Sequence, residues 1–174
     1  MKLRVIGIGG CGCNTVGGLS IKGMTDVDMV VVDNGSELTK RTYPVKKLTV
    51  ELDDPARDDK MWELVAGCPA VLVVAGMGGK YSVEVIEALC RVHGQMHLNV
   101  GFVWVFVVMP FNFEGRDKRA ADNLAKVKNA ASKVITFDNN DLRQYNDRPL
   151  NEAFAVVDQE VCEVIDVAKA SITG

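Results

Sequence analysis

The 174-residue sequence has no excess of positive charge, and this absence limits its partners. Twenty lysines and arginines stand against 23 aspartates and glutamates, which gives a formal net charge of −3. A mildly acidic protein lacks the field that concentrates basic domains on phosphate polymers, so we predict no nucleic-acid partner. The local basic cluster of Lys40, Arg41, Lys46 and Lys47 is interpreted as a solvated loop face.

The sequence also lacks a long apolar run and a disulfide pattern. Its longest apolar segment, Val100 to Met109, has about half of the ~20 residues that a membrane helix needs, and its valines and phenylalanines are typical of a buried strand. Five cysteines are an odd number, and no charged and apolar leader precedes Leu3. These absences predict a cytoplasmic protein with no membrane partner.

Clusters typical of metal or acid–base chemistry are scarce too. Cys11 and Cys13 form a C-x-C pair, but no second cysteine pair or suitable histidine lies nearby. No serine, histidine and aspartate set has a supporting context, and the carboxylates form no isolated pair. We therefore predict no metal ligand and no catalytic residue. At a helix N-terminus either thiol is expected to have a lowered pKa.

What the sequence does contain is a regular alternation of short apolar runs and stretches of helical period. The runs are rich in Val and Ile and do not alternate with polar residues, which is typical of parallel strands covered on both faces. Strands are predicted at Leu3–Ile8, Met29–Val32, Leu48–Val50, Ala70–Val74, Val100–Val108 and Val134–Phe137. Helices are predicted at Gly12–Ile21, Ala56–Val65, Val83–Val92, Arg116–Ala131 and Pro149–Ala170. The fold class that follows is α/β, a doubly wound, mostly parallel sheet with helices on both faces.

The first predicted strand runs into a glycine-rich turn and a helix start. Glycines let the backbone approach an anion, and the helix N-terminus favours a phosphate. Gly7, Gly9 and Gly12 fit G-x-G-x-x-G, and Asp33 follows Gly12 by 21 residues, as in dinucleotide-binding proteins. A nicotinamide cofactor, another phosphate ligand, and glycines used only for packing all remain open at this point.

Three further motifs distinguish between these ligands. A-G-M-G-G follows a predicted strand at 75–79, P-F-N-F-E-G-R follows another at 110–116, and L-N-E-A-F opens the last helix at 150–154. Together with G-G-C-G-C-N at 9–14, they resemble the FtsZ/tubulin family, in particular the nucleotide-binding half of FtsZ. The order and spacing of the motifs match over nearly the whole chain.

The resemblance implies a Rossmann-like guanine-nucleotide pocket at the carboxyl ends of the strands, with GDP or GTP as its ligand. The residues expected at the phosphates are Gly9, Gly10, Gly12, Asn14, Gly76, Gly78 and Gly79. Glu114 matches the family acid that accepts the ribose hydroxyls. Its basic partner is Lys118, or Arg119 if one residue is inserted.

For the base, the resemblance implies Asn139 and Asp158. A carboxylate accepts hydrogen bonds from N1 and the exocyclic amino group of guanine, which adenine cannot reproduce, so Asp158 would set base specificity. The other interpretation of Asp158 is a solvated helix residue. Phe154, one turn earlier, either covers the base or packs in the core.

Two loops depart from the family pattern. The family's G-G-G-T-G-T-G run is shortened here by about three residues, so several phosphate donors are missing. Lys80 either replaces them as a point charge or is exposed at a helix start. The A-G-A-N γ-phosphate loop is absent, and N-T-D-A-Q becomes D-N-G-S-E at 33–37, which predicts an Asn-Gly turn. A diphosphate, a monophosphate and an empty pocket remain open, as does Mg²⁺.

The sequence ends at Gly174, before the family's second domain and its G-x-x-N-x-D-x-x-D catalytic loop. We therefore expect one domain, residues 1–174, without self-sufficient GTPase activity. Its predicted role is partner, cap or regulator of a cytoskeletal filament, through a full-length FtsZ-like protein or through self-association. The alternatives are an NAD(P)-binding protein that uses Asp33 and the glycine loop, and an FtsZ-like scaffold that no longer binds nucleotide.

Overall fold

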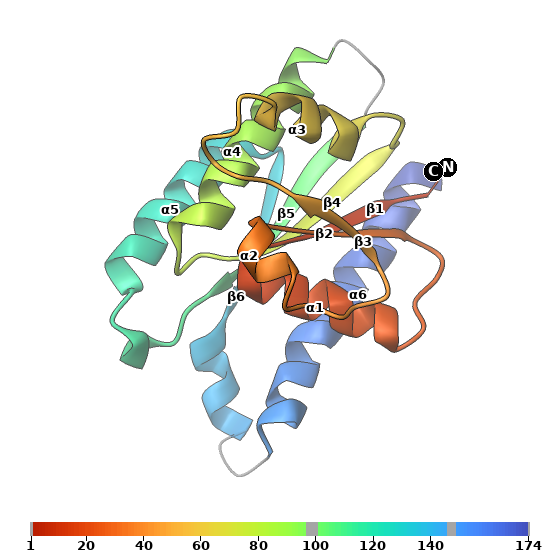
Figure 1. The fold of residues 1–174 in the computed structure, drawn as a ribbon. Helices are drawn as coiled ribbons and strands as arrows, with labels where there is room; N and C mark the ends of the chain where they lie inside the picture. The colour runs from red at the N-terminus through yellow and green to blue at the C-terminus, as the bar shows by residue number, and fades with distance from the viewer. Residues whose placement is uncertain (1, 97–100, 146–148, 174) are drawn as a thin grey trace.

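The computed structural model describes residues 2–96, 101–145 and 149–173, and they form a parallel sheet covered by helices (Figure 1). The strands are β1 Arg4–Ile8, β2 Asp28–Asp33, β3 Lys46–Thr49, β4 Ala70–Gly76, β5 Phe102–Met109 and β6 Lys133–Asp138. All their pairings are parallel, and their order is β3-β2-β1-β4-β5-β6. The predicted doubly wound α/β class is therefore confirmed.

Helices pack on both faces of this sheet. They are α1 Gly9–Ile21, α2 Gly35–Leu38, α3 Arg57–Val65, α4 Lys80–Gln95, α5 Asp117–Ala130 and α6 Leu150–Thr173, with short 3-10 helices η1 Asn112–Glu114 and η2 Asn139–Tyr145. Figure 1 shows α1 and α6 against one side of the sheet, and α3, α4 and α5 against the other. Two apolar cores result, one on each face, which explains why β4 and β5 carry no polar side chain.

The predicted strands agree with the structure to within two residues at each described end, although Val100 lies outside the described residues. Two helix starts differ: α1 begins three residues before the predicted Gly12, and α4 begins three residues before the predicted Val83. In both, the glycine-rich turn is tighter than the sequence indicates.

The segment after β2 contains a helix that the sequence analysis missed. An Asn-Gly turn was predicted here, but the Asn34 side chain accepts a 3.0 Å hydrogen bond from the Glu37 amide and caps the short α2. The Asn34 side chain satisfies an otherwise unpaired helix donor, so it supports a helix start at the position where the dipeptide suggested a turn.

The strand order indicates at which edge of the sheet a ligand would bind. The chain passes from β1 outward through β2 and β3, then crosses back to β4 beside β1. Ligands of open α/β sheets bind beyond the carboxyl ends of strands at such a reversal. The loops after β1 and β4 are the two glycine-rich segments found in the sequence, so both lie at this edge.

Candidate functional site

Two adjoining hollows open at the carboxyl edge of the sheet. The first, the α6 hollow, has a volume of about 430 Å³ and is lined by Cys11, Asn14, Thr15, Val108, Phe111, Glu114, Asn139, Phe154, Val157 and Asp158. The second, the glycine hollow, has a volume of about 320 Å³ and is lined by Gly9, Gly10, Cys11, Asp33, Glu37, Arg41, Gly76, Gly78, Gly79, Tyr81, Ser82 and Arg116. Cys11 lines both, so the hollows adjoin at the first turn of α1.

Two long helices begin at the glycine hollow. Gly9 is the first residue of α1, and Gly79 immediately precedes the first residue of α4. The residue before α1 is Ile8, whose side chain has no acceptor for the free amides, and Gly79 has no side chain at all. Two uncapped N-termini with their partial positive charges therefore face the same cavity, an arrangement that suits phosphate oxygens.

Gly9 is required at its position by both conformation and space. Its φ is +68°, a left-handed conformation that side chains disfavour. A Cβ atom there would also lie 2.5 Å from Oγ of Ser82, which donates a 3.3 Å hydrogen bond to the Ile8 carbonyl. Because Gly9 has no side chain, α4 can approach the turn after β1 closely, and the Gly9 backbone lines the glycine hollow.

A buried asparagine on α5 holds the loop after β4. Nδ2 of Asn123 donates to the carbonyls of Met77 and Gly79, at 2.8 and 3.1 Å. The Met77 amide donates to the Val108 carbonyl at 3.0 Å, which ties the same loop to β5. The glycine segment is therefore fixed from both ends, although it is shorter than the family run.

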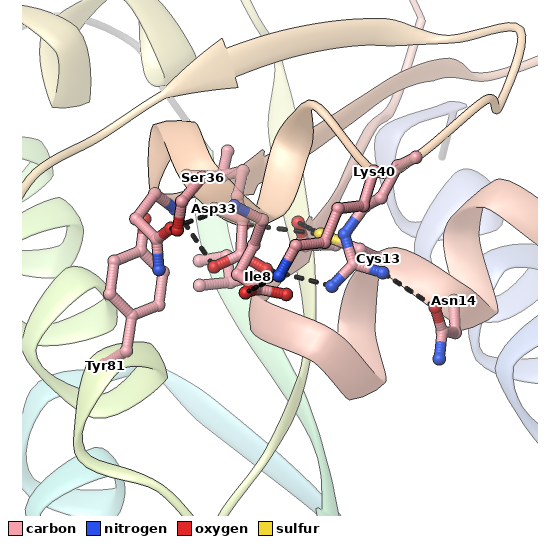
Figure 2. A network of polar contacts seen from close by, with 12 residues as sticks. Ile8, Cys13, Asn14, Asp33, Ser36, Lys40 and Tyr81 are labelled. Atoms are coloured by element: carbon pink, nitrogen blue, oxygen red, sulfur yellow. Dashed lines mark hydrogen bonds and ion pairs between the residues drawn. The ribbon is translucent and has the colours of Figure 1, made fainter.

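Arg41 enters the glycine hollow from the β2–β3 connection. Its guanidinium donates to Asp33 Oδ2 at 3.1 Å and to Asn14 Oδ1 at 2.8 Å (Figure 2). Tyr43 also donates to that Asn14 oxygen, at 2.9 Å. The Arg41 side chain is 12% exposed, so its predicted place on a solvated loop face is wrong. Asp33 is buried at the end of β2, and a buried carboxylate needs a counter-charge, which Arg41 supplies.

The rest of that basic cluster differs from Arg41. Lys40 pairs with Glu37 at 2.8 Å and Lys46 pairs with Glu63 at 2.6 Å, and all four side chains are exposed. Nζ of Lys47 donates to the Arg41 carbonyl from an exposed position. For the three lysines the predicted surface location is therefore correct.

The α6 hollow combines apolar walls with polar groups, three of which come from η1, η2 and α6. Glu114 in η1 accepts a 3.0 Å hydrogen bond from the Phe111 amide, and Asp158 in α6 accepts a 2.6 Å hydrogen bond from Lys22. Oδ1 of Asn139 is buried and accepts no hydrogen bond from any described residue. Because an unpaired buried acceptor is costly, this atom is suited to a ligand donor.

Nine of the twelve residues predicted for the pocket line these hollows. They are Gly9, Gly10, Asn14, Gly76, Gly78, Gly79, Glu114, Asn139 and Asp158. They come from five separate segments: α1, the loop after β4, η1, η2 and α6. The fold therefore brings together residues that the resemblance assigned to phosphate, ribose and base.

The other three predicted residues lie elsewhere. Gly12 packs α1 on the sheet, since a Cβ atom there would lie 2.0 Å from the Val74 carbonyl oxygen. The Lys80 side chain is 80% exposed, pairs with Glu84 along α4 at 2.9 Å and lines neither hollow. Lys118 lines neither hollow but a third one at the start of α5, which shares Arg116 with the glycine hollow.

The cysteines of the first loop are less acidic than predicted. Burial, with a smaller effect of Glu114, raises the pKa of the Cys11 thiol to about 11. Burial likewise raises the pKa of Cys13 to about 12. The prediction of lowered pKa values is therefore wrong, because desolvation of the thiolate outweighs the helix N-terminus.

Sequence reasoning missed two arginines of the glycine hollow, Arg41 and Arg116. Arg116 is in the P-F-N-F-E-G-R motif, but the resemblance implies Lys118 as the basic partner of Glu114. In the structure the Arg116 guanidinium lies 3.6 Å from Glu114. The signal for Arg41 was Asp33, a carboxylate at the end of an apolar strand that needs a cation.

Metal and membrane features can be assessed over the described ranges. Within 2–96, 101–145 and 149–173, no group of three His, Cys, Asp or Glu side chains is placed to hold a metal ion. In the same ranges no helix combines the length and apolar character needed to cross a bilayer.

Comparisons with known proteins find relatives among the FtsZ proteins that the sequence motifs resemble. No protein-family model matches the chain. Cell division protein FtsZ 2 of Halobacterium salinarum is 27% identical over 194 residues, covering 99% of this chain and 48% of that protein. The chain thus spans about half the length of the curated relatives that it matches.

Solved structures show the same fold. A mutant FtsZ from M. jannaschii superposes with a TM-score of 0.76 at 21% identity, covering 98% of this chain and 56% of the other. CetZ2 from Haloferax volcanii, in a GTPγS-bound protofilament, also gives a TM-score of 0.76 at 21% identity, covering 99% and 59%. By sequence the chain is similar to FtsZ proteins over nearly its whole length, and its fold is that of the solved FtsZ and CetZ structures.

Proposed function

We propose that the chain binds a guanine nucleotide across the α6 hollow and the glycine hollow. The observation that carries this proposal is the convergence of nine residues from five segments on two adjoining cavities. The uncapped starts of α1 and α4 suit the phosphates, and the apolar walls with Asn139 and Asp158 suit a purine. Gly12, Lys80 and Lys118 have no role in it.

The environment of Asp33 argues against a dinucleotide. In a dinucleotide site this acid would accept ribose hydroxyls. Here its Oδ1 accepts the Asn34 amide at 3.0 Å, its Oδ2 accepts Arg41, and the side chain is buried. A buried carboxylate already engaged by two donors is less available to ribose hydroxyls, so a nicotinamide cofactor is the weaker proposal.

We also propose that these residues bind the nucleotide without hydrolysing it unaided. The acids lining the two hollows are Asp33, Glu37, Glu114 and Asp158. The two acids of the glycine hollow, where the phosphates are proposed to bind, are Asp33 and Glu37, and they are paired with Arg41 and Lys40. A carboxylate engaged in this way is poorly placed to orient an attacking water.

A filament protein is the proposed partner. Solved relatives include a protofilament of CetZ2 and a dimer of FtsZ, and two aromatic side chains of this chain are exposed near the hollows. Phe113 in η1 is 78% exposed and Phe154 in α6 is 46% exposed. Exposed aromatic groups around a ligand site favour a contact with another protein, and a chain docked there would act as partner, cap or regulator.

Binding is tested by extraction and titration of the purified chain. We expect GDP or GTP in the extract of the heat-denatured protein, and one GDP per chain by calorimetry after the nucleotide has been removed. ATP and NADP⁺ serve as matched titrants. An extract with NADP⁺, or no heat with GDP or GTP up to millimolar concentration, would contradict the proposal.

Hydrolysis and partnership need separate measurements. We expect no phosphate release from GTP above the buffer rate, and release by the chain alone would overturn the second proposal. In co-sedimentation with a polymerising FtsZ, we expect the chain in the pellet, shortened filaments, or both. The variant Phe113→Ser should abolish this effect, and the matched variant Trp62→Ser, at an exposed aromatic of α3, should not.

A further inference from the structure

We propose that Arg41 and Arg116 form a two-arginine clamp for the pyrophosphate group of the ligand. The clamp rests on the proposed function and deepens it, because it identifies the side chains that recognise the phosphates. Both arginines line the glycine hollow, together with the glycines of the α1 and α4 turns. They come from different segments, the β2–β3 connection and the residue that precedes α5.

Arg41 is positioned over the first turn of α1. A Cβ atom on Gly10 would lie 3.8 Å from Arg41 Nη2, so the guanidinium lies beside the amides of the cradle. Asp33 and Asn14 fix its orientation by one hydrogen bond each (Figure 2). A guanidinium has five N–H donors, and Nε of Arg41 is buried with no acceptor among the described residues. This side chain therefore has donor capacity that its protein contacts leave unused.

Arg116 approaches the same hollow from the loop before α5. A Cβ atom on Gly78 would lie 3.2 Å from both Cδ and Nη1 of Arg116, so the side chain lies along the glycine loop. It is 53% exposed, and its ion pair with Glu114 is 3.6 Å long, beyond a good hydrogen bond. An exposed pair of this kind is weak, so the guanidinium is free to reorient towards a phosphate.

The charge balance of the hollow depends on Arg41. The hollow contains two acids, Asp33 and Glu37, and Glu37 is neutralised by Lys40 at 2.8 Å. Asp33 is neutralised by Arg41. Loss of Arg41 would remove a phosphate ligand and also leave a buried, unpaired carboxylate facing the phosphates. Planar guanidinium groups match phosphate oxygens in a bidentate way, so a lysine should replace Arg41 only in part.

The test is calorimetry on the full chain, with inorganic pyrophosphate and GDP as separate probes. We expect Arg41→Gln and Arg116→Gln each to weaken pyrophosphate binding by about tenfold or more, since a charge-assisted hydrogen bond is lost. Arg41→Lys should recover part of that loss. Arg91→Gln is the matched control, because Arg91 forms a similar pair with Asp58 at 2.7 Å between α3 and α4, and it should leave the affinity unchanged.

The variant Asp33→Asn separates the clamp from a purely structural ion pair. The asparagine keeps an acceptor oxygen for Arg41, leaves the contact between Arg41 and Asn14 in place and removes a negative charge, so we expect a smaller loss of pyrophosphate affinity than in Arg41→Gln. A loss as large as that in Arg41→Gln would mean that the pair acts only through the loop, and would overturn the clamp. Circular dichroism and melting curves identify any variant that is unfolded; if Arg41→Gln is one, Arg116→Gln decides.

The two probes distinguish the failure of the clamp from the failure of the nucleotide proposal. Wild-type binding of pyrophosphate that falls in the arginine variants supports the clamp, even if GDP does not bind. GDP and pyrophosphate binding that neither arginine variant weakens overturns the clamp and leaves the nucleotide proposal standing. A wild type that binds neither probe overturns both.

Discussion

Asp158 of α6 accepts a 2.6 Å hydrogen bond from Lys22, the residue that follows α1. This pair closes one side of the α6 hollow, where Asp158 also faces the cavity. Lys22 is 57% exposed, and exposed ion pairs contribute about 0 to 1 kcal/mol. A ligand with two donors can therefore take the carboxylate from Lys22 at little cost.

The first prediction concerns base selectivity. The variant Asp158→Ala should lower GDP affinity by about tenfold or more and change ADP affinity little, because only guanine presents two donors to the carboxylate. Calorimetry with both nucleotides measures the ratio. Asp166→Ala, at an exposed aspartate of the same helix, is the matched control and should preserve the ratio. An equal loss for GDP and ADP would exclude Asp158 as the specificity residue.

The second prediction concerns the loop after β4. Replacement of Asn123 by alanine leaves the Met77 and Gly79 carbonyls without their donor, and the free energy of unfolding should fall by about 1 to 3 kcal/mol. Urea unfolding followed by circular dichroism gives this value. Asn129→Ala, at an exposed position of α5, should change it by less than about 0.5 kcal/mol. Equal stability of the two variants would show that Asn123 does not hold the loop.

The sequence predicts the sheet well because its strands are buried on both faces. Short apolar runs such as Ala70–Val74, rich in β-branched residues, are typical of strands buried on both faces. The stretches between these runs are long enough for one helix each. Helix starts at glycines were predicted less well. Glycine is a poor helix former, so Gly9 and Gly10 looked like loop, whereas the packing of α1 on the sheet extends the helix through them.

Residue identity and motif spacing predicted most of the residues that line the two hollows, but not the role of each one. Gly10 and Gly12 look alike in sequence, but one lines the glycine hollow and the other packs against β4, and only the three-dimensional contact distinguishes them. The position of Arg41 depends on Asp33, eight residues away on the other side of α2. Because charge patterns on a loop do not report burial, no reading of the basic cluster alone could separate Arg41 from Lys40.

The third prediction compares two glycines of α1. An alanine in a helix is usually favoured over glycine by about 1 kcal/mol, and Gly18→Ala should follow that rule because nothing lies within 4 Å of its Cβ position. Gly12→Ala should instead lower the free energy of unfolding by about 1 to 3 kcal/mol, since its Cβ would lie 2.0 Å from the Val74 carbonyl oxygen. Urea unfolding of both variants measures the difference. A stabilised Gly12→Ala would contradict the packing role.

The fourth prediction uses the half-buried Cys11 thiol at the junction of the two hollows. With a pKa raised by burial from 9.0 to about 11, Cys11 has about 100-fold less thiolate near neutral pH than an unperturbed cysteine. Alkylation by iodoacetamide should be slow at pH 7 and should accelerate about tenfold per pH unit up to pH 10, because the thiolate is the reactive form. Mass spectrometry of the labelled peptides gives the rate at each cysteine.

Nucleotide should alter this rate only at the site. Cys11 lines both hollows, so GDP should slow its alkylation further at every pH. Cys90 on the buried face of α4 also has a pKa of about 11 through burial, and it lines neither hollow, so its rate is the internal control and should not respond to GDP. Rapid labelling of Cys11 at pH 7 would show that desolvation does not dominate there. Equal protection of Cys11 and Cys90 would indicate general stabilisation by GDP instead of occupancy of the hollows.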